Sequence, residues 1–218
     1  MRFPNAFSGV KKLFTAEILQ IIGVVAIGLS AFFLIILGAS VDSDNAVTGL
    51  SSFAFMSIFA IGGAVVSIIA AILKLVGLAK AGKDNKYFTY ALYCIIVGMI
   101  FVCIGSFFQS SNTTIFNICD SINKIADLVA TILIIQGVMN LAADIGDSEM
   151  VMKGATLFKV ITAIYVFAIL GAITFAVMYP FPFLRIIAAV FSCISILLSV
   201  VSYILFLAYL ARAKKMFG

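Results

Sequence analysis

The feature that most constrains this chain is a set of long apolar runs that contain no charged residue. The longest extends over residues 87–119, and others cover residues 21–41, 53–73, 160–184 and 186–211. A helix of about 20 apolar residues crosses the hydrocarbon core of a bilayer, which is about 30 Å thick. Several such runs in one chain predict an integral membrane protein that crosses the bilayer more than once.

The composition also indicates a membrane location. Hydrophobic residues make up 64% of the 218 residues and charged residues only 11%, whereas about a quarter of the residues in a soluble domain are charged. So few charged residues cannot cover a surface that faces water. We therefore expect a multi-pass membrane protein, in the cell membrane if the organism is prokaryotic, with the lipid bilayer as its main partner.

The apolar runs also predict the fold class. Only α-helices and closed β-barrels satisfy their backbone hydrogen bonds in lipid, and continuous apolar runs are typical of helices. The sequence predicts an all-α fold, in which residues 1–218 form a single domain, a bundle of six transmembrane helices. The predicted spans cover residues 17–39, 53–79, 87–109, 125–143, 157–179 and 183–211. The fourth has the weakest signal, because Asp127 and Asp144 leave a short uncharged stretch between them.

The distribution of Lys and Arg predicts the orientation, because these residues are enriched in cytoplasmic loops. If the chain crosses the membrane at all six spans, only Lys124 and Arg185 of the 14 Lys and Arg residues lie opposite the N-terminus. Both termini are therefore expected to be cytoplasmic. The basic cytoplasmic side should attract anionic lipids, by about 1 kcal/mol per basic residue. It also accounts for the basic pI without a nucleic-acid partner.

A weak internal repeat favours three tandem helical hairpins. The odd-numbered spans begin with the similar segments KLFTA, KYFTY and TLFKV, and the even-numbered spans end with LAKA, LAAD and LARA. Apolar helices with basic ends also produce such matches by chance. The outer connections differ from one another. Residues 40–52 are expected to form a flexible loop, residues 110–124 a short amphipathic helix on the outer membrane surface, and residues 179–183 a tight turn.

Charged side chains inside a membrane are costly, so they are candidate functional residues. Lys74 lies about two turns inside the cytoplasmic end of the second span, on the same face as Gly63 and Ser67. We expect its methylene stem to extend along the helix until the ammonium group reaches the interface. The alternative is a buried cation that pairs with Glu17 or Asp144, or that binds an anionic group.

A polar strip in the fourth span is the best candidate for a ligand-binding site, with Lys74 nearby. Gln136 and Asn140 lie one turn apart, and Asp144 continues the same face. The preferred interpretation is that the two amides form hydrogen bonds between helices, worth about 0.6 to 2 kcal/mol each in membranes. The alternative is that the strip lines a binding cavity.

The sixth span carries small residues at spacings of four and three, which is typical of a seam where another helix approaches closely. The seam consists of Ala188, Ser192, Ser195, Ser199 and Ser202. We expect it to be a packing surface. The partner helix could belong to the same bundle, to a second copy of the chain or to another membrane protein.

The sequence gives little support for an enzyme. It has no His, which is the commonest general base and metal ligand. No motif for a catalytic serine, a zinc site or a nucleotide is present, and the four Cys have no zinc or disulfide spacing. We expect no catalytic residue, metal or cofactor, and an intramembrane enzyme is the least favoured alternative.

Two functions remain. The first is a non-catalytic accessory or structural subunit that acts through helix–helix contacts in the membrane. The serine seam, the small loops and the lack of ionisable groups near the centres of five spans favour it. The alternative is a carrier or binding protein for a small, largely apolar molecule, as a transporter component that uses Gln136, Asn140, Asp144 and Lys74.

Overall fold

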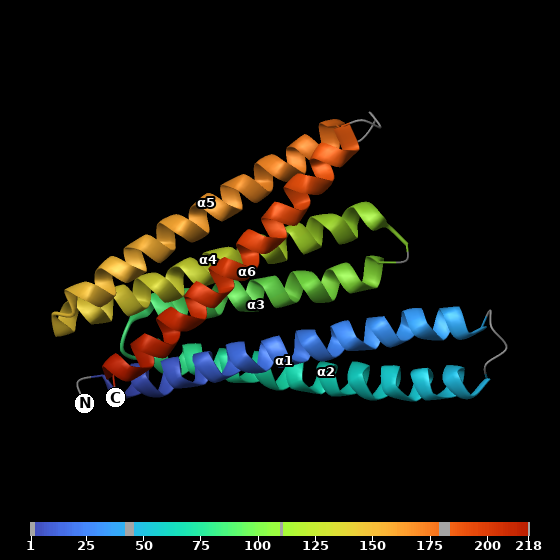
Figure 1. Ribbon diagram of the computed structural model, residues 1–218. Coiled ribbons are helices and arrows are strands. Elements are labelled where there is room, and N and C mark those ends of the chain that lie inside the picture. The colour runs from blue at the N-terminus through green and yellow to red at the C-terminus, as the bar shows by residue number, and fades with distance from the viewer. Residues whose placement is uncertain (1–2, 42–45, 110, 179–183, 218) are drawn as a thin grey trace.

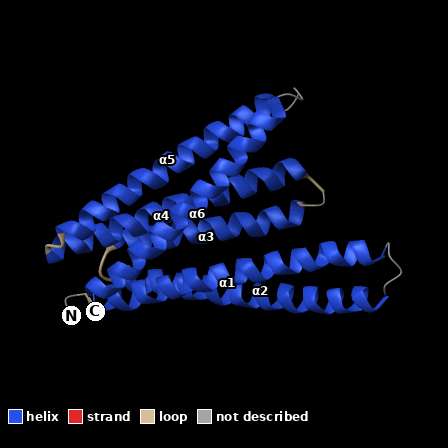
Figure 2. Cartoon of the chain, viewed as in Figure 1, coloured by secondary structure: helices blue, strands red, loops and turns tan. Residues whose placement is uncertain are grey.

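A computed structural model of the chain describes residues 3–41, 46–109, 111–178 and 184–217. Throughout these residues the regular secondary structure is α-helix alone (Figure 1, Figure 2). The helices are α1 (Pro4–Val41), α2 (Ala46–Ala81), α3 (Lys86–Phe108), α4 (Thr113–Ile145), α5 (Ser148–Met178) and α6 (Leu184–Phe217). The predicted all-α fold is confirmed.

Most of these helices have the length and composition of membrane spans. Within the described residues, five stretches are long and apolar enough to cross a bilayer, and they belong to α1, α2, α3, α4 and α6. Their mean hydropathy lies between 1.5 and 2.6. The chain is therefore a helical protein with the properties of a multi-pass membrane protein.

Consecutive helices pack against each other in pairs: α1 with α2, α3 with α4, and α5 with α6. Both termini lie at one end of the molecule, together with the turns that join α2 to α3 and α4 to α5 (Figure 1). We call this the terminal end. The turn between α3 and α4 lies at the opposite end, and the helices diverge from one another toward that side. This pairing is the one that tandem hairpins require.

The helices α1 and α2 approach closely because glycines face each other along their contact. A Cβ atom added at Gly9 would lie 2.5 Å from the backbone oxygen of Gly77, and one added at Gly63 would lie 3.0 Å from the backbone oxygen of Gly23. Small residues that let two backbones approach are typical of helix packing in membranes. The glycines therefore set the register of this hairpin.

The charged turn between α2 and α3 forms hydrogen bonds to the starts of α1 and α3 at the terminal end. Asp84 accepts hydrogen bonds from the backbone N–H of Ala6 at 2.7 Å and from the side chain of Asn5 at 2.9 Å. It thus caps the first turn of α1, where backbone N–H groups have no partner within the helix. Asn85 caps α3 by accepting a hydrogen bond from the N–H of Tyr87. One short turn therefore stabilises the start of two helices.

The hydrophobic core also lies toward the terminal end. Its most buried side chains come from all six helices and include Leu13, Leu78, Phe88, Ile135, Met150 and Leu210. Farther along the same hairpins, large apolar side chains are exposed over much of the helix surface. Lipid is as apolar as these side chains, so a bilayer can cover surfaces that water could not.

Several helices extend beyond the predicted spans. The structure starts α1 at Pro4 rather than at residue 17, starts α5 at Ser148 rather than at 157, and continues α6 to Phe217 rather than ending it at 211. The prediction places each boundary where charged residues begin. A charge ends a membrane span without ending a helix, because the backbone hydrogen bonds continue into the water phase.

The predictions for the outer connections need correction. Most of the loop predicted at residues 40–52 is wrong, because α1 continues to Val41 and α2 begins at Ala46. Residues 113–124 are helical as predicted, but they form the first turns of α4 rather than a separate helix, and Asn112 caps this long helix. The turn predicted at residues 179–183 lies outside the described residues.

Candidate functional site

An ion pair joins α1 and α2 inside the apolar part of the molecule. The Nζ atom of Lys74 lies 3.0 Å from Oε1 of Glu17, and the two side chains are only 19% and 3% exposed. The hydroxyl of Tyr203 on α6 donates a hydrogen bond to Oε2 of the same carboxylate at 2.7 Å. The structure therefore agrees with the alternative interpretation of Lys74, in which the buried cation pairs with Glu17.

The ion pair lies below the charged surface of the terminal end. Lys74 is separated from Lys80 by about 9 Å along α2, at a rise of about 1.5 Å per residue. On the other side of the pair, α1 has no charged residue over 18–41 and α2 has none over 46–73. Both charges are therefore within stretches that have the properties of membrane spans, where ionisable residues are rare and commonly functional.

Two adjoining cavities, each of about 270 Å³, open beside the ion pair. Gln20, Lys74 and Asp127 line both of them, and we call the two cavities together the polar chamber. The other polar side chains around the polar chamber are Glu17 on α1, Ser67 on α2, and Asn123, Thr131, Tyr165, Ser199, Ser202 and Tyr203 on α4, α5 and α6. Five of the six helices thus contribute polar groups at one level of the molecule.

Asp127 is the charged group of the polar chamber that the ion pair does not neutralise. Lys74 attracts its carboxylate and Glu17 repels it, and Lys124 lines a smaller neighbouring cavity together with it. Within the part of the chain that the structure describes, its carboxylate accepts no hydrogen bond and forms no ion pair. If all three groups are ionised, two carboxylates face one ammonium group. The polar chamber then has an excess negative charge.

The sequence assembles this site through helix faces of small residues. On α2, Gly63 and Ser67 pack against Gly23 of α1, and Lys74 continues the same face two turns later. An antiparallel hairpin in this register brings Lys74 to Glu17. Because the side chains on this face are small, the backbones stay close and the two long charged side chains meet directly.

The polar strip predicted in α4 does not lie in the polar chamber. Gln136 is half-buried, whereas Asn140 and Asp144 are exposed near the terminal end of α4. None of the three lines either cavity, so the structure does not bring them together with Lys74. The polar residues of α4 that line these cavities with Lys74 are Asn123, Asp127 and Thr131, all of which precede Gln136 in the helix.

The structure describes the side chains of only part of the serine seam of α6. Ser199 and Ser202 line the polar chamber together with Tyr203. The side chains of Ala188, Ser192 and Ser195 lie outside the described residues. For the described part of the seam, the small side chains therefore border a cavity.

Sequence reasoning named Glu17 only as an alternative partner of Lys74, and it missed Asp127 and Tyr203 as site residues. Glu17 is treated there mainly as the start of the first span, and Asp127 as a charge that shortens the uncharged stretch of the fourth. A signal was nevertheless present. A hairpin that turns near residues 42–45 places Glu17 within about one turn of Lys74, and opposite charges at one level of two neighbouring helices predict an ion pair.

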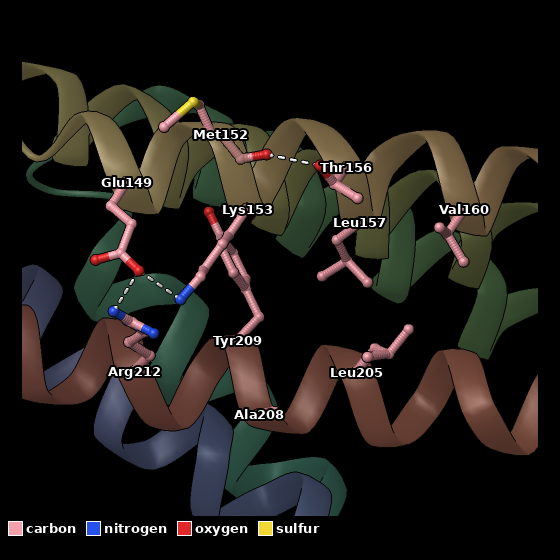
Figure 3. A pocket seen from close by; sticks show the side chains of 10 residues that line it. All are labelled: Glu149, Met152, Lys153, Thr156, Leu157, Val160, Leu205, Ala208, Tyr209 and Arg212. Atoms are coloured by element: carbon pink, nitrogen blue, oxygen red, sulfur yellow. Dashed lines mark hydrogen bonds and ion pairs between the residues drawn. The ribbon is translucent and has the colours of Figure 1, made fainter.

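A separate cavity, of about 560 Å³, lies between α5 and α6 (Figure 3). Its walls are mostly apolar, with Leu157 and Val160 on α5 and Leu205 on α6. Charged side chains gather at its end nearest the terminal end, where Glu149 lies opposite Arg212. We call this cavity the α5–α6 groove.

The charged end of the α5–α6 groove is a three-residue cluster. Oε1 of Glu149 accepts a hydrogen bond from Nζ of Lys153 at 2.7 Å and another from the Arg212 guanidinium at 2.7 Å. The hydrogen bond from Lys153 and the charge of Arg212 lower the pKa of Glu149 below its ordinary value. The carboxylate therefore stays ionised, and the cluster has two positive charges and one negative charge.

Comparison of the chain with protein-family models, with curated proteins and with solved structures finds no match.

Proposed function

We propose that this protein spans the membrane six times with both termini in the cytoplasm, and that it binds or carries a small positively charged solute in the polar chamber. The observation that carries the proposal is the exposed Asp127 carboxylate, which lines both cavities together with Lys74 and interacts electrostatically with the Glu17–Lys74 pair. A cation bound beside Asp127 would compensate the charge of its ionised carboxylate, which the Glu17–Lys74 pair does not neutralise.

The charge of the solute distinguishes this proposal from the carrier expected from the sequence. That expectation concerned a largely apolar molecule at Gln136, Asn140 and Asp144 with Lys74 nearby, whereas the cavities beside Lys74 have ionisable and hydroxyl groups among their apolar side chains. Ionised carboxylates are stable inside a membrane only with a compensating charge or with water. Glu17 has such a partner in Lys74, and the solute would supply one for Asp127.

The membrane orientation rests on the basic residues of the terminal end. The turns after α2 and α4 lie at the same end as the two termini (Figure 1). This is the end where the positive-inside rule places the cytoplasm, because Lys80, Lys83 and Lys86 surround the first of these turns. The polar chamber then lies in the half of the membrane nearer the cytoplasm.

The test uses purified protein in detergent with sodium, potassium and methylammonium chloride as probes. A bound cation should raise the melting temperature, because a ligand at 100 times its Kd stabilises the folded state by about 2.7 kcal/mol. We expect at least one probe to do so for the wild type and not for Asp127→Asn. Asp120→Asn, on the same helix but paired with the exposed Lys124, is the matched control and should keep the response.

The proposal fails if no probe raises the melting temperature of the wild type above that in choline chloride of equal ionic strength. It also fails if Asp127→Asn responds as the wild type does, because the bound cation would then lie elsewhere.

An accessory or structural subunit is the second candidate. It is favoured by the exposed apolar side chains on the parts of α1 and α2 away from the terminal end, such as Ile35 and Ile61. Another membrane protein could cover this surface in place of lipid. Purification in mild detergent tests this function, because a stoichiometric protein partner that Asp127→Asn does not release would favour the subunit over the carrier.

A further inference from the structure

The α5–α6 groove has a different chemistry from the polar chamber. Its long walls are apolar, and its charged groups are all at the end nearest the terminal end (Figure 3). Leu205 is about 10 Å deeper than Arg212 along α6, at a rise of about 1.5 Å per residue. In the proposed orientation, the groove runs from the cytoplasmic interface toward the middle of the membrane.

The charged end presents cations that are accessible from outside. The side chains of Lys153 and Arg212 are 44% and 49% exposed, and a single oxygen of Glu149 accepts hydrogen bonds from both. An anionic group with several oxygens would offer each cation its own acceptor. A phosphate diester is such a group, and a guanidinium ion can bind two of its oxygens at once.

We propose that the α5–α6 groove binds an acidic phospholipid of the cytoplasmic leaflet, with its phosphate at Lys153 and Arg212 and one acyl chain between Leu157 and Leu205. The site is separate from the polar chamber and depends only on the membrane orientation proposed above. Basic pockets between transmembrane helices on the cytoplasmic side are suited to acidic head groups.

The shape of the groove favours a lipid over a free phosphate ion. Its volume of about 560 Å³ lies within the usual range of ligand pockets, about 300–1,000 Å³. A free phosphate would use the charged end and leave the apolar walls uncovered. A phospholipid matches both parts, because its charge and its hydrocarbon are joined in the same order as the two parts of the groove.

The experiment measures how much phosphatidylglycerol and phosphatidylcholine stay bound to the full chain. The protein is purified from nanodiscs that contain equal amounts of the two lipids, and retained lipid is counted by native mass spectrometry. We expect phosphatidylglycerol to be retained preferentially. Arg212→Gln should lower its retention about fivefold, the ratio that corresponds to about 1 kcal/mol per basic side chain near an anionic surface.

Three further variants separate the parts of the site. Ala208→Phe fills the groove without changing its charge, so it should lower phosphatidylglycerol retention. Glu149→Gln removes the internal competitor of the phosphate and should raise it. Lys83→Gln removes an exposed charge of the α2–α3 turn, outside the groove, and should leave it unchanged. Melting temperatures in the same detergent show that each variant is folded.

Equal retention of the two lipids would overturn the proposal. A loss in Lys83→Gln as large as that in Arg212→Gln would also overturn it, because the basic surface as a whole would then attract the lipid. Displacement of the lipid by inorganic phosphate, with no effect of Ala208→Phe, would show that only the charged end binds and would contradict a lipid site.

Discussion

At the scale of single residues, the contact between Glu17 and Lys74 has the largest energetic consequence. Both side chains lie mostly out of water, and each depends on the other for compensation of its charge. Removal of one partner from such a pair leaves an uncompensated charge, at a typical cost of about 3–5 kcal/mol. Replacement of both partners by uncharged residues costs much less, because neither member of the pair is then left without its partner.

We therefore predict that Lys74→Met lowers the melting temperature in detergent strongly, and that Glu17→Gln in the same chain restores most of the loss. A thermal melt followed by size-exclusion chromatography measures both. If the single and double variants melt at the same temperature, the ammonium group is solvated by water, as the snorkelling interpretation requires.

The residues of this site show what could be predicted from the sequence. Lys74 was recognisable as an intramembrane charge, and its partner Glu17 was among the alternatives. The contributions of Asp127 and Tyr203 depend on how three hairpins pack against one another, which the apolar periodicity does not determine. For the same reason, the sequence favoured Gln136 and Asn140 as the site. A sequence pattern does not show whether a polar side chain lines a cavity or lies on the outer surface of a helix.

At the scale of elements, the α1–α2 hairpin depends on glycines at particular positions. A methyl group at Gly9 would press against the backbone of α2, whereas Gly28 on the same helix has no atom of the protein within 4 Å of an added Cβ. Overpacking of this kind costs about 1–3 kcal/mol. Alanine in an open helical position instead gains up to about 1 kcal/mol over glycine.

We predict that Gly9→Ala lowers the melting temperature and that Gly28→Ala leaves it unchanged or raises it. The two variants are matched in chemistry and in helix, so helix propensity alone would give them the same effect. Similar melting temperatures for both would mean that α1 and α2 are farther apart than described.

The elements themselves were predictable in number and type, because continuous apolar runs of bilayer length permit little besides helices. Their ends were not. Apolar runs indicate where the lipid begins. The helix ends at Pro4, Ser148 and Phe217 show that these helices continue past that level. Capping residues such as Asn112 and Asp84 set the helix ends instead, and they lie outside the apolar pattern.

At the scale of the whole molecule, the proposed topology predicts opposite accessibility for two connections. In a variant without the four native cysteines, single cysteines replace Ser43, between α1 and α2, or Lys83, between α2 and α3. A thiol reagent that does not cross membranes should label the first in intact cells and the second only after permeabilisation. The reverse pattern would invert the orientation, and with it the leaflet assigned to the α5–α6 groove.

The most direct test of the account concerns whether the polar chamber admits water and cations inside the membrane. In the same cysteine-free background, Thr131→Cys places a thiol on the wall of the polar chamber, and Val25→Cys places one on the exposed apolar surface of α1. The measurement is the rate at which a small, positively charged, water-soluble thiol reagent modifies each of them in native membranes. We predict rapid modification at Thr131 that Asp127→Asn slows, and no modification at Val25. If the thiol at Thr131 is as unreactive as the one at Val25, the polar chamber is closed to water and cations, and the proposed function is wrong.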